Sequence, residues 1–399
     1  MLDFFSARAR SVNSKRAADE CLDIAFPNGL PDNCRVVIFN ATLGHKLDKV
    51  AEAFQNALPS AAIYGASGCA VTGREGIGES MYEVGIMAIC GPENEIDAAA
   101  VTEIYSRNSY EKGLELARTL KNRCDRIRVI YLLCSGIDID NALVLQAFHE
   151  VFGKEVTIFG GTSSDNMLGR YSFQYHDGMV KEHDAFAIGF ADPTLCNATR
   201  ATHGFTAYGE PLIATKTEGN LIYEFNGRGA WSEYTARINK PPEAACGDTI
   251  PVGALAEALP PELAAEYGSS HILRVITKHD GETMYYPVTC GENLRVWLTM
   301  RDEELIFSEQ RRALDYLKME IGEGKPVAVF QTDCLARGRF LFNRIVKDEI
   351  IAMMQNALSA DDVVPAWLGN YGFGEYARLG GKNAYHNYST ALLVLYRRG

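Results

Sequence analysis

Three stretches of the sequence decide the fold: RVVIFNAT (35–42), VIYLLCSG (129–136) and VAVFQTDC (327–334). Each is a short apolar run that ends in a polar turn, a pattern typical of a buried β-strand. A helical pattern follows each of them, at about 47–58, 141–152 and 340–357. A second apolar run then enters a glycine-containing turn, at 65–68, 160–165 and 369–372, and a further strand follows at 84–90, 185–191 and 391–396. The order strand–turn–helix–strand therefore appears three times.

This repeated order predicts neighbouring parallel strands that are joined by helices. We therefore expect an α/β fold with mixed (α+β) sheets, in two related halves built from repeated strand–turn–helix–strand units, with helices layered on the sheets. Unrelated α/β proteins also alternate in this way. Between the second and third units we expect strands at 221–225, 271–277, 283–288 and 294–300 and a long helix that opens on Asp302. The predicted division is an N-terminal arm or helix at 1–25, a first domain at 26–208 and a second domain at 209–399.

The composition is that of an ordinary globular protein, with 47% hydrophobic and 23% charged residues among 399. The formal net charge of −12 repels phosphate backbones and anionic lipid, so neither nucleic acid nor a membrane is an expected partner. No stretch approaches the ~20 apolar residues of a spanning helix. The segment from Met1 to Ala18 contains no apolar core of a signal peptide. We therefore expect a cytoplasmic protein.

The polar turns should gather at one edge of each sheet, because the carboxyl ends of parallel strands lie together. Ligands of open α/β sheets bind at that edge, where backbone N–H groups and helix N-termini can hold an anionic group. The residues that follow predicted strands, and are therefore candidates for ligand binding, are Ser67, Ser163, Asp165 and Cys334. The residues Asn40, Ser135 and Asp333 share this position.

A glycine-rich loop at 73–78 carries two further candidates for ligand binding, Arg74 and Glu75. No G-x-G-x-x-G opens a helix here and no Lys-Ser/Thr pair follows the glycines, so a phosphate-binding loop is not expected. Arg74, or Arg337 in the other half, would clamp a ligand carboxylate bidentately. The alternative is a solvated loop whose charged side chains only face water.

The ten cysteines are scattered and form no C-x-x-C pair, so neither a zinc ribbon nor a thioredoxin-like site is expected. Most should be reduced, buried thiols. Cys334 differs because it follows a strand, precedes a helix and lies near Arg337, which would lower its pKa and favour the thiolate. A thiol-dependent enzyme that uses Cys334 is therefore one alternative. The sequence favours a ligand-lining or structural cysteine, and a binding protein over an enzyme.

Glu375 and Asn387 flank the last predicted strand and can converge on the same sheet edge. The alternative is that turn residues here satisfy backbone groups only. None of the eight histidines forms an H-E-x-x-H motif, so a zinc hydrolase is not expected. A single histidine can hold haem iron without leaving a wider motif, and the candidates are His386, His176 and His203.

Short motifs in a fixed order now indicate a family. In the N-terminal half they are GASG (65–68), GREG (73–76) and FGGTSSD (159–165). In the C-terminal half they are EGN (218–220), YEFNGR (223–228), CLARG (334–338), GE (374–375) and HNYST (386–390). With these motifs the sequence resembles the FIST family, the F-box and intracellular signal transduction proteins, over nearly the whole chain, as an N-terminal and a C-terminal FIST domain. Asn226 and Gly229 stand where the family commonly has Asp and Pro.

The resemblance implies a sensory module for small ligands, among them amino acids or other carboxylates. Similar bacterial proteins are input modules for histidine kinases, chemotaxis receptors or cyclic-di-GMP enzymes, and some similar stand-alone proteins bind haem and sense nitric oxide. This chain contains no kinase, receptor or cyclase segment, so we expect a stand-alone type that acts through a separate signalling protein. We expect the ligand to contact the candidate residues of both halves, and its binding to shift the halves. A haem-binding gas sensor is the alternative function.

Overall fold

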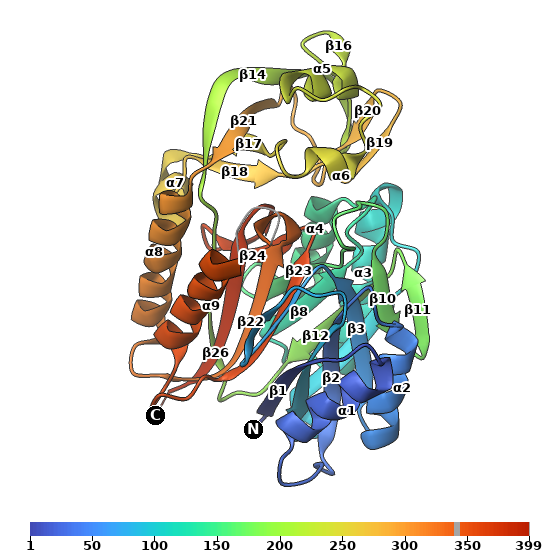
Figure 1. The fold of residues 1–399 in the computed structure, drawn as a ribbon, viewed down its shortest axis with the longest axis vertical. Coiled ribbons are helices and arrows are strands. Elements are labelled where there is room, and N and C mark those ends of the chain that lie inside the picture. The colour runs from blue at the N-terminus through green and yellow to red at the C-terminus, as the bar shows by residue number, and fades with distance from the viewer. Residues whose placement is uncertain (339–343, 399) are drawn as a thin grey trace.

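The fold is mixed α/β, as expected, with helices that cover several β-sheets (Figure 1). The computed structural model describes residues 1–338 and 344–398. Within these residues the strands form three sheets of six strands and one sheet of eight. The six-stranded sheets belong to three units with the same order of elements, and the eight-stranded sheet is inserted into the third unit.

The first unit contains the first of the three predicted repeats. Its elements are β1 (Asp3–Arg10), α1 (Ser14–Ala25), β2 (Cys34–Thr42), α2 (Leu47–Ala57), β3 (Ala62–Gly68), the hairpin β4 (Val71–Gly73) and β5 (Gly76–Gly78), and β6 (Glu83–Cys90). β2 lies parallel to β3 and antiparallel to β6, which in turn pairs with β1. Phe54 of α2 packs with Val37 and Phe39 of β2 in one hydrophobic cluster, so the helices bury their apolar faces on this sheet.

The second unit repeats this order. Its elements are β7 (Ile96–Val101), α3 (Ser109–Arg123), β8 (Val129–Cys134), α4 (Asn141–Phe152), β9 (Thr157–Thr162), the hairpin β10 (Phe173–His176) and β11 (Met179–Glu182), and β12 (Ala185–Phe190). The predicted helix at 141–152 coincides with α4. Its N-terminus is fixed by Asp140, whose side chain accepts hydrogen bonds from the backbone N–H groups of Ala142 and Leu143.

The third unit has the same order, interrupted after its first strand. Its elements are β13 (Cys196–Thr202), α8 (Glu303–Ile321), β22 (Lys325–Cys334), α9 (Arg344–Leu358), β23 (Ala366–Gly372), the hairpin β24 (Glu375–Leu379) and β25 (Lys382–His386), and β26 (Thr390–Arg397). Asp302 caps α8, as predicted, by accepting a hydrogen bond from Leu305 N. The predicted start of the next helix, at Phe340, lies outside the described residues. Among the helices described, none has the length and apolar character needed to cross a bilayer.

The eight-stranded sheet is inserted between β13 and α8. Its segment contains β14 (Phe205–Glu218), β15 (Leu221–Phe225), β16 (Arg228–Gly229), α5 (Ala230–Arg237), α6 (Cys246–Thr249), β17 (Leu255–Ala258), α7 (Pro261–Tyr267), β18 (His271–Arg274), β19 (Lys278–Asp280), β20 (Thr283–Tyr285) and β21 (Arg295–Arg301). In Figure 1 this sheet lies at one end of the molecule, above the three six-stranded sheets. Leu273 and Val275 of the insertion belong to one hydrophobic cluster with Cys334, so the insertion covers the strand end at which the sequence predicts a ligand.

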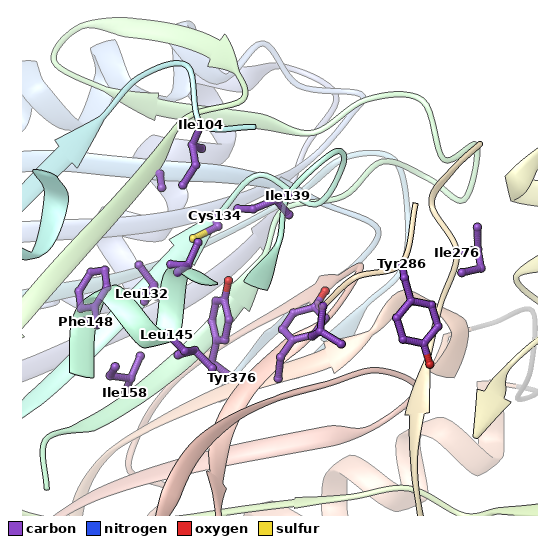
Figure 2. Close-up of a cluster of buried hydrophobic side chains, with 14 of the residues drawn as sticks. Ile104, Leu132, Cys134, Ile139, Leu145, Phe148, Ile158, Ile276, Tyr286 and Tyr376 are labelled. Atoms are coloured by element: carbon purple, nitrogen blue, oxygen red, sulfur yellow. The ribbon is translucent and has the colours of Figure 1, made fainter. Parts of the chain in front are cut away.

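The three units exchange their hairpins. β4–β5 of the first unit pairs with β23 of the third, β10–β11 of the second with β3 of the first, and β24–β25 of the third with β9 of the second. Each six-stranded sheet thus consists of four strands of one unit and a hairpin from another. Figure 2 shows one result: Tyr376 of β24 lies among side chains of the second unit, such as Cys134 and Leu145.

The carboxyl ends of β3, β9 and β23 meet where the hairpins leave the units. Ser164 N donates to Ser67 O and Cys69 N donates to Tyr371 O, both at 3.1 Å. Thr162 N donates to Gly374 O at 2.9 Å. Because these bonds join ends of different units, the polar turn residues of all three units come close together.

Candidate functional site

Two predicted serines lie buried at the junction of β3 and β9. The Ser67 hydroxyl donates to Ser164 O at 2.7 Å and accepts from Phe173 N at 3.0 Å. The Ser163 hydroxyl lies 2.6 Å from that of Ser172. These hydroxyl groups therefore hold the chain that follows β9 against the end of β3.

Asp165 organises the next loop. Its fully buried carboxylate accepts four backbone hydrogen bonds, from Leu168 (2.8 Å) and Gly169 (3.1 Å) at Oδ1 and from Arg170 (2.8 Å) and Tyr171 (3.1 Å) at Oδ2. Each of the two carboxylate oxygens accepts two hydrogen bonds. Asp165, which the sequence predicts to contact a ligand, therefore holds the backbone of the loop 165–171 in this structure.

Arg74 and Glu75 lie apart from these buried residues. They form the turn of the β4–β5 hairpin and are exposed. Glu75 Oε2 accepts a hydrogen bond from Arg8 N at 3.0 Å. Because this hairpin joins the sheet of the third unit, the structure does not bring the pair together with Ser67 and Ser163.

A group of fully buried polar side chains lies around the end of β22. We call it the β22 cluster, and its members are Asp333, Arg337, Lys347, Tyr371 and Glu375. Lys347 Nζ lies 3.2 Å from Asp333 Oδ2, and Arg337 Nε lies 3.9 Å from Asp333 Oδ1. The Lys347 ammonium also lies 4.6 Å from the centre of the Tyr371 ring. Fully buried Lys, Arg, Asp and Glu are rare in proteins, and such clusters are candidates for functional sites.

Protonation in the β22 cluster is strongly perturbed. Burial alone would raise the pKa of Asp333, but the charges of Lys347 and Arg337 outweigh it and lower that pKa. Burial and the Arg337 charge lower the pKa of Lys347, although Asp333 opposes this. Burial raises the pKa of Glu375 well above its usual value, and Asp333 adds to the rise. The arrangement therefore places a carboxyl that favours its neutral form beside a buried ion pair.

Cys334 does not have the environment expected of a nucleophile. Burial raises the pKa of its thiol well above the usual value, Glu375 adds to the rise, and the lowering effect of Arg337 is outweighed. The residues that follow, Leu335–Arg337, form a short 3-10 turn and not the expected helix N-terminus. The expectation of a lowered pKa is therefore wrong, because desolvation of the thiolate dominates.

Glu375 and Asn387 lie at the open end of the β24–β25 hairpin, where Glu375 pairs with His386. Glu375 Oε2 accepts hydrogen bonds from Ser389 Oγ (2.7 Å) and Ser389 N (3.3 Å). In the part of the chain that the structure describes, the second oxygen of Glu375 has no hydrogen-bond partner. The Asn387 amide donates to Phe373 O at 2.7 Å and accepts from Val275 N at 3.3 Å. Asn387 thereby ties the third unit to the inserted sheet.

An open groove of about 400 Å³, which we call the interunit groove, lies between the second unit and the inserted sheet. Its lining residues are Ser106, Arg107, Asp138, Glu218, Gly219, Asn220, Leu221, Lys278 and Tyr285. Lys278 donates to Asp138 at 2.8 Å, and Ser106 donates to the other oxygen of Asp138 at 2.6 Å. Burial would raise the pKa of Asp138, but these two hydrogen bonds lower it. An ion pair thus joins the two walls.

A narrow cavity of about 10 Å³, large enough for about one water, adjoins the groove. Asp138 and Tyr285 line both spaces, and Tyr385 lies on the cavity wall. The Tyr385 hydroxyl accepts a hydrogen bond from Asn387 at 3.3 Å. Tyr385 therefore lies between this cavity and the predicted residue Asn387. Sequence reasoning missed the groove, since Asp138 and Lys278 are distant in the chain.

The three histidines proposed as haem ligands do not fit that role in this structure. Both ring nitrogens of each are engaged: His386 contacts Tyr267 Oη and Ala377 O, and His176 contacts Asp177 and Asp184. The ring of His203 contacts His271 O and Phe205 N. An axial ligand needs a free nitrogen lone pair. Within residues 1–338 and 344–398, no group of His, Cys, Asp and Glu side chains is arranged to hold a metal ion.

Several solved structures are similar to this chain over their whole length. One is cyanuric acid hydrolase from A. caulinodans, with 6% identity, a TM-score of 0.39 and 100% of both chains covered. Another is a chorismatase, with 9% identity, a TM-score of 0.33 and 99% of both chains covered. At TM-scores below 0.5 these likenesses support no conclusion about activity.

Sequence comparison bears on the family. None of the curated proteins matches the chain. The FIST N domain family does match it, over residues 35–228. This segment includes most of the first unit, the second unit and the start of the inserted sheet. The C-terminal FIST domain stays a prediction, whereas residues 35–228 of this chain match a FIST N domain.

Proposed function

We propose that this protein is a cytoplasmic sensor that binds a small ligand and acts through a separate signalling protein. The FIST N match at residues 35–228 supports a sensory role. The observation that carries the proposal is the interunit groove, because its walls come from the second unit and the inserted sheet. A ligand that binds better to one arrangement of these walls than to another shifts the population between them.

The charges in the groove favour a small carboxylate ligand, with an amino acid as the leading example. Lys278 and Arg107 supply cationic donors for a carboxylate, and Asp138 and Glu218 supply acceptors for an ammonium group. Lys278 directs one donor to Asp138 and is 33% exposed, which leaves further N–H groups for a ligand. The ion pair between the walls would therefore rearrange when the ligand binds.

The residues predicted from the sequence supply the second part of the proposal. Arg337, Glu375 and Asn387 are fully buried, so a ligand in the groove does not touch them directly. Tyr385 lines the narrow cavity beside the groove and accepts a hydrogen bond from Asn387, which supports a connection between the groove and Asn387. In this proposal the groove receives the ligand and the β22 cluster responds to the movement of the inserted sheet.

The proposed output is a ligand-dependent contact with another protein, such as a histidine kinase, a chemotaxis receptor or a cyclic-di-GMP enzyme. The resemblance to sensory input modules supports this choice. Binding of such a partner should differ between the ligand-free and ligand-bound protein, and is measured with both forms immobilised at equal density.

The first experiment screens amino acids and small mono- and dicarboxylates by thermal unfolding, followed by titration calorimetry of each hit. Lys278→Met should weaken binding roughly 10- to 100-fold, because it removes a charge-assisted hydrogen bond worth about 1.5–3 kcal/mol. Lys325→Met is the matched control, since Lys325 is exposed and pairs with exposed Asp361. It should leave binding unchanged.

Two outcomes would contradict the proposal in different ways. If no compound stabilises the wild-type protein at millimolar concentration, the ligand-binding function is wrong. If a ligand binds but Lys278→Met has no effect while Arg337→Lys abolishes binding, the ligand lies at the β22 cluster and not in the groove. Thermal unfolding of each variant without ligand checks that it is folded.

A further inference from the structure

Two cysteines face each other at one end of the first unit. Cys34 begins β2 and Cys90 ends β6, and the antiparallel register places them directly opposite each other. Both are 2% exposed and belong to the same hydrophobic cluster. The Cys34 Sγ lies 3.8 Å from the backbone oxygen of Ile89, the residue before Cys90. Both thiols are free.

This arrangement is within reach of a disulfide bond. Directly opposed residues of antiparallel strands have Cα atoms ~4.5–5.5 Å apart, and a disulfide spans ~4.4–6.8 Å between Cα atoms. A β-bulge follows Cys34 in the pairing with β6, so the strand is locally irregular there. An irregular strand end can adjust by the small distance that a sulfur–sulfur bond requires.

Cys34 can be reached from the surface although little of it is exposed. It lines a small pocket of about 120 Å³, which holds only a few waters. The other lining residues are Leu30, Pro31, Asp32, Ala57, Leu58, Pro59, Ser60 and Ala61. A pocket of this size admits a small oxidant such as hydrogen peroxide and excludes a bulky disulfide such as oxidised glutathione.

The two thiols differ in acidity. The hydrogen bond from Cys90 lowers the pKa of Cys34, against the opposing effect of burial. The same hydrogen bond and burial raise the pKa of Cys90. By contrast, burial raises the pKa of Cys134 to about 12, so that thiol stays protonated. Cys34 lines the pocket and Cys90 is absent from its lining, so Cys34 is the thiol placed to meet a small oxidant first and Cys90 is the resolving thiol.

We propose that Cys34 and Cys90 form a peroxide-reactive oxidation site that closes reversibly to a disulfide. The Cys34 thiolate attacks one oxygen of hydrogen peroxide, which gives a sulfenic acid and releases water once the leaving hydroxide takes up a proton. The Cys90 sulfur then attacks the Cys34 sulfur, forms the disulfide and releases a second water. In total, two thiols and one peroxide give one disulfide and two waters. A dithiol reductant restores the thiols. This redox input is independent of the proposed ligand function.

The experiment follows each cysteine by peptide mapping. The reduced wild-type protein is treated with hydrogen peroxide, remaining thiols are alkylated after unfolding, and the non-reduced digest is analysed by mass spectrometry. We expect a linked pair of peptides that contain Cys34 and Cys90 before Cys21 or Cys134 loses its alkylation. Oxidised glutathione at the same concentration should react much more slowly.

Three variants test the assigned roles. Cys90→Ser should leave Cys34 as a sulfenic acid that dimedone traps, and Cys34→Ser should leave Cys90 reduced. Cys21→Ser is the matched control, because Cys21 is buried in the same cluster and burial raises its pKa. It should not change the rate of linkage. Circular dichroism of each variant checks its fold.

Two results would overturn the inference. One is that Cys34 and Cys90 both stay alkylatable at a peroxide dose that oxidises other cysteines of the folded protein. The other is that the folded protein gives the same mixture of linked peptides as the urea-unfolded protein, since the selectivity would then not come from the fold.

Discussion

The ammonium group of Lys347 lies 3.2 Å from the carboxylate of Asp333, and neither side chain is exposed to solvent. Asp333 is also hydrogen-bonded to Gln331 and Thr390, and Arg337 lies on its other side. The removal of one partner from a buried ion pair leaves an uncompensated charge, which costs more than the pair contributes. The stability of the third unit therefore depends on Asp333.

Asp333→Asn should lower the free energy of unfolding by about 3–5 kcal/mol, because the amide cannot balance the charges of Lys347 and Arg337. Urea denaturation measures this change. Asp361→Asn, which breaks an exposed pair with Lys325, should cost less than about 1 kcal/mol. A loss at Asp333 as small as that at Asp361 would contradict a buried, charged pair.

The free energy of unfolding of Glu375→Gln, minus that of wild type, should increase as the pH rises. Burial raises the pKa of Glu375, so the folded state keeps a proton that the unfolded chain releases above about pH 4.3. The resulting stability is fully present below that pH and is lost as pH rises toward the folded-state pKa, by up to about 1.4 kcal/mol per pH unit. Gln is neutral at all pH and lacks this loss.

Unfolding in urea at pH 5 and pH 8 tests this prediction. The stability of Glu375→Gln minus that of wild type should increase from pH 5 to pH 8. A difference that is constant with pH would show that Glu375 ionises normally in the folded protein.

Asp165→Ala should destabilise the loop 165–171, because four backbone N–H groups lose their acceptor. We expect a loss of about 3 kcal/mol, since each net hydrogen bond to a charged group contributes ~1.5–3 kcal/mol and water replaces part of it. Asp165→Asn should lose less, because its amide oxygen still accepts. Hydrogen exchange of the loop amides measures the effect. If Asp165→Ala left exchange unchanged and only weakened ligand binding, its role would be in recognition.

Addition of haem to the purified protein should give no Soret band of a histidine-ligated complex. The rings of His203 and His386 are buried, and both nitrogens of each ring already have partners. Coordination by either would break those contacts. Absorption spectra of wild type and His386→Ala test this. A Soret shift that is present in wild type and lost in the variant would contradict the prediction and restore the haem-sensor alternative.

The local parts of the fold were predictable from the sequence. The apolar run at 129–134, the helix at 141–152 and the cap at Asp302 all depend on residues within a few positions of each other. Hydrophobic periodicity and N-capping are properties of such short segments, so the chain itself carries them. The strand–turn–helix–strand order, which appears three times in the sequence, is local in the same way.

The hairpin exchange was not predictable. β4–β5 pairs with β23, almost three hundred residues further along the chain, and the pairing carries Arg74 and Glu75 away from Ser67. The alternation of side chains along a strand predicts which residues face the core. It does not predict which sheet the strand joins. The mistaken expectation for Cys334 has a similar cause, since its motif shows a nearby arginine and not the burial that governs its pKa.

The candidate sites divide in the same way. The sequence by itself placed polar residues such as Asp333, Glu375 and Asn387 at strand ends, because strand–turn patterns are local. Only the tertiary structure brought Lys347 of α9 to Asp333, and Lys278 of the inserted sheet to Asp138 of the second unit. Contacts between distant segments depend on how helices and sheets pack, and packing is decided by the burial of the whole chain at once.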